Sequence, residues 1–283
     1  MKVRMYNVGF GDCFCLRDRK KSLLVDFGTN NSRIEGRPRR EIFDVIISDL
    51  STIKSKNLLL THFHMDHLSG LLYMMKKKDI SVDFGKIYLP DVFSKKEMSR
   101  TLVLLLLADL LKESGLPSRQ VSLFALVDAL LENKQNVELL SRGKLFENKY
   151  QALWPDTDVI RKETDEVYNR ICEDGKFKEV MDVLLEFAEK LRLIVWSMTA
   201  EGNKPAETME RETDSTASEL TEQPEVRQKI IRAYVYEREF RRIKALPDFK
   251  KLLAWLNENQ INLRQFKHCL LYTSPSPRDG ATS

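Results

Sequence analysis

The sequence predicts an α/β (α+β) fold, with a sheet of short strands in the first third of the chain and mainly helices after it. Three observations predict this fold. The first 26 residues contain three short apolar segments separated by turns, strand and helix patterns then alternate as far as residue 93, and helical spacing of apolar residues dominates beyond it. A chain of 283 residues that is 42% hydrophobic can form one large core or two modest ones.

The N-terminal strands are expected over Lys2–Val8, Cys13–Arg17 and Ser22–Asp26. Glycine or charged turns separate these segments, which predicts an antiparallel meander. The pattern then predicts a helix, a short apolar strand, a second helix and a further strand, over Arg39–Thr52, Asn57–Leu60, Leu68–Lys77 and Lys86–Phe93.

Helical patterns follow this region, through Ser114 and again over Ser118–Leu131. A return to strand is expected over Asn148–Asp158, and amphipathic helix over Glu163–Leu193 and Glu225–Asn259. The predicted division is a core (1–93), a helical insertion (94–147), a core strand (148–160) and a second helical insertion (161–268) with a mobile linker (199–225) that is poor in large apolar residues. The helical insertions could cover a site or bind a partner, and the sequence leaves both open.

Charge and cysteine content narrow the class of protein. Lys and Arg total 46 against 42 Asp and Glu, and a net charge of +4 does not by itself indicate nucleic-acid or membrane binding. Four cysteines and an N-terminus without a secretory pattern predict a cytoplasmic protein. The longest apolar run, Leu102–Leu111, contains Asp109 and is shorter than the ~20 residues of a membrane span, so it predicts a buried helix.

The candidate metal-binding residues lie in Leu58–Gly70, "LLLTHFHMDHLSG", which holds three of the four histidines in the chain. A buried strand that ends at Thr61 delivers the next residues to the carboxyl end of the sheet, where open α/β sheets place ligands. His62 and His64 can point to one side and Asp66 and His67 to another, which predicts two neighbouring metal sites. A histidine-rich turn without metal is the alternative interpretation.

Cys13 and Cys15 form a second candidate pair for a metal. Alternate residues on a strand share one face, so we interpret both as small core side chains instead.

The segment "THFHMDH" resembles the signature of the metallo-β-lactamase fold hydrolases. The opening "MYNVGFGDCFCL" is similar to the first hairpin of the subgroup that contains the hydrolase domain of the bacterial DNA-uptake channel protein. The segment "LLVDFGTN" is similar to the strand of that subgroup that ends in Asp-x-Gly. The resemblance covers roughly Met1–Pro90 and predicts a bacterial protein.

This resemblance implies the N-terminal part of an αββα sandwich with large helical insertions. It also implies up to two metal ions, usually zinc with manganese or iron as alternatives, bridged by a hydroxide that attacks the substrate. In this chain His62 and His64 would hold the first ion, and Asp66 and His67 the second. Asp66 would also orient the water as the catalytic residue, while the turn with Asp26 and Gly28 would brace the metal loop from behind.

The function predicted from this resemblance is metal-dependent hydrolysis, with a phosphodiester or nucleic acid as the favoured substrate. A small-molecule esterase or lactamase is the neighbouring alternative. A non-catalytic metal-binding or partner-binding module with helical insertions is the alternative from another class.

The C-terminal part raises a separate expectation. The family takes further ligands, two histidines and an aspartate, from its C-terminal half, and here only His268 remains. The segment Cys269–Asp279, "CLLYTSPSPRD", matches one reading frame of a transposase sequencing adapter. We therefore expect Cys269–Ser283 to be a non-native tail, the chain to be truncated near His268, and the chain as it stands to be inactive. His268 as the missing ligand is the less favoured interpretation.

Overall fold

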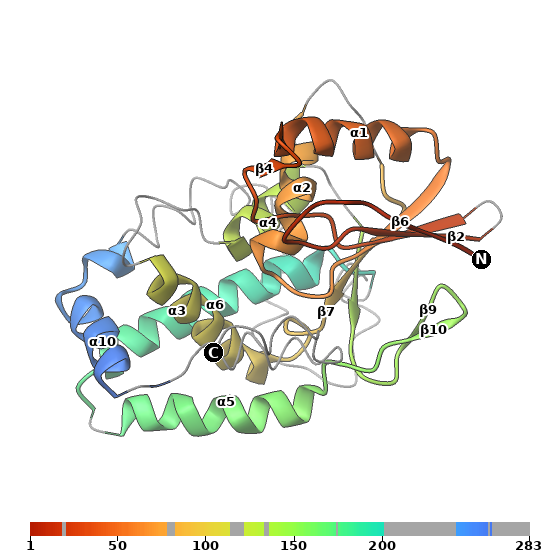
Figure 1. The fold of residues 1–283 in the computed structure, drawn as a ribbon. Coiled ribbons are helices and arrows are strands. Elements are labelled where there is room, and N and C mark those ends of the chain that lie inside the picture. The colour runs from red at the N-terminus through yellow and green to blue at the C-terminus, as the bar shows by residue number, and fades with distance from the viewer. Residues whose placement is uncertain are drawn as a thin grey trace. The chain divides into compact units, whose positions relative to one another are not determined.

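The computed structural model describes residues 1–18, 21–77, 83–113, 122–132, 136–173, 175–200, 242–259 and 261. The chain forms two compact units (Figure 1), the first from Met1–Pro90 with Ser122–Leu139 and the second from Asp91–Val121 with Leu140–Ser283. Most of the expected linker, the first part of the helix expected over Glu225–Asn259, His268 and the expected tail lie outside the described residues.

The first unit contains a six-stranded sheet in the order β1-β2-β3-β6-β7-β8. β1, β2 and β3 pair antiparallel, which confirms the predicted meander, whereas β3, β6 and β7 pair parallel and make the sheet mixed. The strands span Lys2–Met5, Phe14–Asp18, Lys21–Val25, Ser55–Leu59, Ile87–Pro90 and Val137–Leu140.

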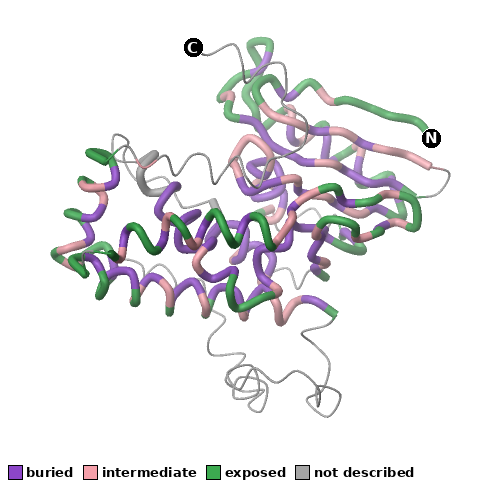
Figure 2. The backbone as a smooth tube through the Cα atoms, turned by 90° about the horizontal axis from the view of Figure 1, so that it is seen from below, coloured by how far each residue is buried: buried purple, intermediate pink, exposed green. Residues whose placement is uncertain are grey.

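Burial differs along the order of the strands. β7 is buried at every residue, as expected for a strand between two parallel or covered neighbours. β1 is exposed at every residue and lies at the edge of the sheet, and Figure 2 shows the exposed N-terminal segment. The exposed strand β1 is therefore first in the order of the sheet, and the fully buried strand β7 is fifth.

Three helices belong to the first unit: α1 (Arg39–Ser51), α2 (Met65–Met75) and α4 (Ser122–Glu132). α2 packs against both α1 and α4. Aromatic rings join these elements, because the Phe43 ring of α1 lies 5.3 Å from Phe27 after β3 and 5.6 Å from Tyr73 of α2. A small hairpin of β4 (Arg33–Ile34) and β5 (Arg37–Pro38) directly precedes α1.

The second unit is mainly helical. It contains the 3₁₀ helix η1 (Lys96–Met98) and the helices α3 (Ser99–Glu113), α5 (Thr157–Cys172), α6 (Lys178–Ser197) and α10 (Pro247–Glu258). α3 packs against α5 and α6, and the ring of Phe177 lies 5.7 Å from that of Trp255 in α10. The run Leu102–Ala108 of α3 is buried, which confirms the predicted buried helix.

Two expected elements differ in the structure. Within the expected core strand 148–160 only Tyr150–Gln151 (β10) is strand, and it pairs with Leu145–Phe146 (β9) outside the six-stranded sheet. The carboxylate of Asp156 accepts hydrogen bonds from the amides of Asp158 and Val159, so the segment starts α5 instead. The helical pattern over Glu163–Leu193 is divided between α5 and α6.

No helix among the described residues has the length and apolar character needed to cross a membrane. The cytoplasmic location expected from the cysteine content stays a prediction.

A buried polar network fixes the second unit internally. The Glu189 carboxylate accepts hydrogen bonds from Arg192, at 2.6 and 3.0 Å, and from the Ser99 hydroxyl. Arg192, 5% exposed, also donates to the carbonyl oxygens of Phe93 and Ser94 at 3.2 and 3.3 Å. The network therefore joins α6 to the start of α3 and to the loop before it, and it pairs the buried guanidinium of Arg192 with the half-buried carboxylate of Glu189.

We predict that Arg192→Leu lowers the free energy of unfolding of the second unit by about 3 kcal/mol, because it leaves the Glu189 carboxylate without its cation. Lys190→Ala is the matched control, since its ion pair with Glu186 is exposed and contributes at most ~0.5 kcal/mol. Denaturant unfolding of both variants tests this, and equal losses would contradict it.

The same network predicts an acid dependence. Burial alone would raise the pKa of Glu189, but the hydrogen bonds from Arg192 and Ser99 outweigh it and hold this pKa below its usual value of 4.5. A depressed carboxylate pKa stabilises the fold above the unfolded-state pKa, and this stabilisation is lost as the pH falls through the folded-state pKa. Stability relative to Glu189→Gln should therefore shrink below pH 4.5, as measured by denaturant unfolding from pH 7 downward. A difference independent of pH would contradict this assignment.

Candidate metal centre

The centre is built where two parallel strands end. β3 and β6 are in register up to Val25 and Leu59, and the amide of Asp26 donates to the Leu59 carbonyl at 2.8 Å. The residues that follow each strand therefore meet at one edge of the sheet. The Asp26 carboxylate accepts hydrogen bonds from the amide (2.8 Å) and the hydroxyl (2.7 Å) of Thr61, the residue before the first histidine.

The first turn of α2 supplies the other donors. His64 precedes the helix with an extended backbone, and Asp66 and His67 occupy its first turn. A carboxylate in the first turn is stabilised by the helix dipole. The amide of Phe27 donates to the His67 carbonyl at 2.7 Å, so the segment after β3 is bonded directly to this turn.

Two glycines permit this close packing. A Cβ atom on Gly28 would lie 2.6 Å from the carbonyl oxygen of Asp66. A Cβ atom on Gly11 would lie 2.2 Å from the Gly28 carbonyl oxygen and 2.7 Å from that of Asp66. Any larger residue at either position would push these segments apart.

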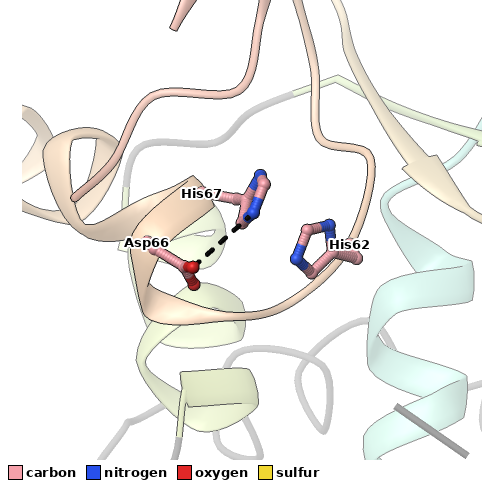
Figure 3. Close-up of side chains that lie close together, drawn as sticks. All are labelled: His62, Asp66 and His67. Carbon is pink, nitrogen blue, oxygen red and sulfur yellow. Dashed lines mark ion pairs between the residues drawn. The ribbon is translucent and has the colours of Figure 1, made fainter. Parts of the chain in front are cut away.

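His62, Asp66 and His67 lie together as a group of possible metal donors (Figure 3). Each offers one ligand atom, and these atoms all lie within 4.8 Å of one another. The rings of His62 and His67 are 3.5 Å apart between centroids, and His67 Nε2 lies 3.8 Å from the Asp66 carboxylate. Two buried imidazoles and one half-buried carboxylate therefore face a common point.

Asp26 fixes the orientation of His67. The Asp26 carboxylate, 2% exposed, lies 2.9 Å from His67 Nδ1, which leaves Nε2 facing Asp66. Burial alone would lower the pKa of His67, but Asp26, with the charges of Asp66 and Asp12, outweighs it and raises this pKa. A carboxylate on the far nitrogen of a ligand histidine fixes its tautomer and strengthens it as a donor.

His64 lies outside this group. Its ring is 4.9 Å from that of His62, but the donor group of the structure joins His62 to Asp66 and His67. The chain turns into α2 at Met65 and brings the first turn of the helix beside His62. The predicted pairs, His62 with His64 and Asp66 with His67, stay a prediction.

Asp12 is a neighbour of the centre that the sequence did not indicate. Its carboxylate lies 3.8 Å from His67 Nδ1, and it forms a second possible donor group with Asp26 and His67. The signal was available in the sequence, because "GFGD" places a carboxylate in a glycine turn beside a predicted strand. Cys13, the next residue, is buried, and burial raises the pKa of its thiol, which disfavours the thiolate that a metal requires.

The donor set fits a divalent cation. Neutral imidazole and carboxylate are the usual ligands of zinc, and both are present with a hydrogen-bonded outer partner. Within the described part of the chain, Asp12, Asp26 and Asp66 form no ion pair with lysine or arginine. The negative charge of the centre is therefore not neutralised by the basic side chains around it.

Comparison with known proteins supports this chemistry. Residues 6–91 match the family model described as the metallo-beta-lactamase superfamily. The match makes this segment similar to that superfamily and covers less than half of the chain. The mixed sheet with its helices is consistent with a metallo-β-lactamase-like α+β fold.

No curated protein and no solved structure matches the chain. The metallo-beta-lactamase match ends at residue 91, so it does not extend to the helices of the second unit. The subgroup of the DNA-uptake channel, bacterial origin and the truncation stay predictions.

We predict that Asp26→Asn weakens metal binding about 10- to 100-fold, because an amide cannot fix His67 as a carboxylate does. Ser69→Ala is the control for general loosening of the loop that follows β3. The hydroxyl of Ser69 in α2 is hydrogen-bonded to the backbone of Thr29 in that loop. Chelator competition with zinc measures both affinities. An equal loss in both variants would assign Asp26 to loop stability alone.

Proposed function

We propose that the chain is a metal-dependent hydrolase whose favoured substrate is a phosphodiester or nucleic acid. The observation that carries the proposal is the group of His62, Asp66 and His67 within the segment that matches the metallo-beta-lactamase superfamily. Zinc is the proposed metal, in up to two ions, and manganese or iron are alternatives with the same donor types.

Each residue of the centre has a proposed role that follows from its contacts and its exposure. His62 and His67 offer imidazole nitrogens to the ion, and Asp26 keeps Nε2 of His67 directed to the centre. A divalent ion bound here would supply Lewis acidity and a water of lowered pKa, near 7 in zinc enzymes. Asp66, at 28% side-chain exposure, is the most accessible of the three donors and is proposed to orient the attacking water.

A non-catalytic metal-binding or partner-binding module is the alternative from another class. The three donors around His62 would serve it as well, so metal binding alone does not separate it from a hydrolase. A small-molecule esterase or lactamase would use the same centre, so only the substrate separates it from the main proposal.

We predict that Asp66→Asn lowers turnover of bis(p-nitrophenyl) phosphate about a hundredfold and lowers zinc content much less, because the imidazoles remain as ligands. Hydrolysis and metal content are measured on the same preparation, beside p-nitrophenyl acetate and nitrocefin as ester and lactam substrates. Asp44→Asn is the control, since Asp44 bonds Tyr73 and Lys77 away from the donors.

A parallel loss of turnover and metal would contradict the role of Asp66. Preference for the ester or the lactam would favour the small-molecule alternative. Metal binding without turnover on any substrate would contradict hydrolysis by this chain and would agree with the inactivity expected from its sequence.

A further inference from the structure

A basic surface segment lies in the same unit as the metal centre. The arginine hairpin, defined here as residues 33–40, contains β4, β5 and the first residues of α1. All four of its arginines are exposed: Arg33, Arg37, Arg39 and Arg40. Positive φ angles at Glu35 (49°) and Gly36 (78°) form its tight turn, so the arginines stand on a short, defined scaffold.

The charge of the arginine hairpin is largely free for a ligand. Arg37 pairs with Glu41 at 3.5 Å, but both side chains are more than half exposed and such a pair is weak. Arg33 donates to its own turn, to the Gly36 carbonyl at 3.4 Å. Within the described ranges, Arg39 and Arg40 form no ion pair.

One loop connects the arginine hairpin with the metal centre. In the loop of residues 7–12, Asn7 donates to the Glu35 carboxylate of the hairpin at 2.8 Å. At its other end Gly11 packs against the backbone of Asp66, and Asp12 lies 3.8 Å from His67. The loop of residues 7–12 therefore contacts the arginine hairpin at one end and the metal donors at the other.

This loop displays an aromatic side chain. Phe10 is 71% exposed although its backbone is bonded on both sides. Its amide donates to the Asn31 side chain at 2.9 Å, and its carbonyl accepts from the Asn30 amide at 2.8 Å and from the Thr29 hydroxyl at 3.1 Å. An exposed ring on a fixed backbone offers a flat apolar face at little cost in loop ordering.

We propose that Phe10 and the arginine hairpin form a binding surface for single-stranded nucleic acid, which leads the strand to the metal centre. Guanidinium groups bind phosphate through several N–H donors, and bases stack on exposed aromatic rings. A duplex keeps its bases stacked on each other, so Phe10 favours a single strand. The proposal rests on the proposed function for the role of the metal centre, but binding itself requires no metal.

The experiment measures binding of a fluorescein-labelled single-stranded 20-nucleotide DNA to the 283-residue chain in EDTA, over a series of salt concentrations. Arg39→Ala with Arg40→Ala should reduce the slope of log affinity against log salt by about 1.4, since each phosphate contact on a single strand contributes about 0.7. The matched control, Arg161→Ala with Arg170→Ala, removes two exposed arginines from α5 and should keep the wild-type slope.

Phe10→Ala should weaken binding about tenfold and leave the salt slope unchanged, because stacking releases no counterions. Phe10→Trp should restore the affinity. Val45→Ala, which removes an exposed apolar side chain of α1, should bind as the wild type does. Thermal unfolding of each variant confirms that its fold is retained.

The proposal is overturned by equal slopes in the two arginine variants, by unchanged affinity in Phe10→Ala, or by tighter binding of the same DNA as a duplex. Because every measurement is made in EDTA, a lack of hydrolysis leaves the binding result intact. Hydrolysis with metal but without these binding effects would support the proposed function and refute this surface.

Discussion

The buried carboxylate of Asp26 is the interaction on which the metal centre depends. It accepts hydrogen bonds from Thr61, which follows β6, and lies within hydrogen-bond distance of His67 in α2, while Asp26 itself directly follows β3. A buried carboxylate is costly unless it is fully bonded, and here Thr61 supplies two bonds and His67 of α2 lies at a third position around the same anion. These bonds hold Asp26 at a positive φ of 54°, a backbone conformation that is strained for a residue other than glycine.

The contact between Asp26 and His67 also requires three backbone segments to lie close together: the N-terminal loop, the segment after β3 and the first turn of α2. Asp26 can reach His67 only if the chain after β3 lies directly on the first turn of α2, and Gly28 provides that contact. Gly11 then lets the N-terminal loop lie on both. As a consequence Asp12 borders the imidazole of His67, and Phe10, two residues earlier in the same loop, has a hydrogen-bonded backbone and an exposed ring.

The sequence predicted what short-range patterns encode. Strand alternation and helical spacing located β1 to β3, α1, β6, α2 and β7 within a few residues, and the histidine motif located the donors. It did not predict β8, because the four residues Val137–Leu140, three of them buried, are too few to show a period that separates strand from helix. The contact of Asp12 with His67 joins residues that are 55 positions apart, and no local pattern predicts such a contact.

The first unit carries charges of opposite sign at the metal donors and at the arginine hairpin, and a polyanion interacts differently with each. Asp12, Asp26 and Asp66 surround His67, so without a cation the centre repels phosphate. The arginine hairpin carries the opposite sign and does not depend on the cation. The proposed binding of a strand to the hairpin therefore needs no metal, whereas a phosphate approaches the donors more favourably once a divalent ion has reduced the negative charge there. In the proposed function, hydrolysis at the carboxylates around His67 therefore depends on the metal. Binding of the strand to the arginine hairpin does not.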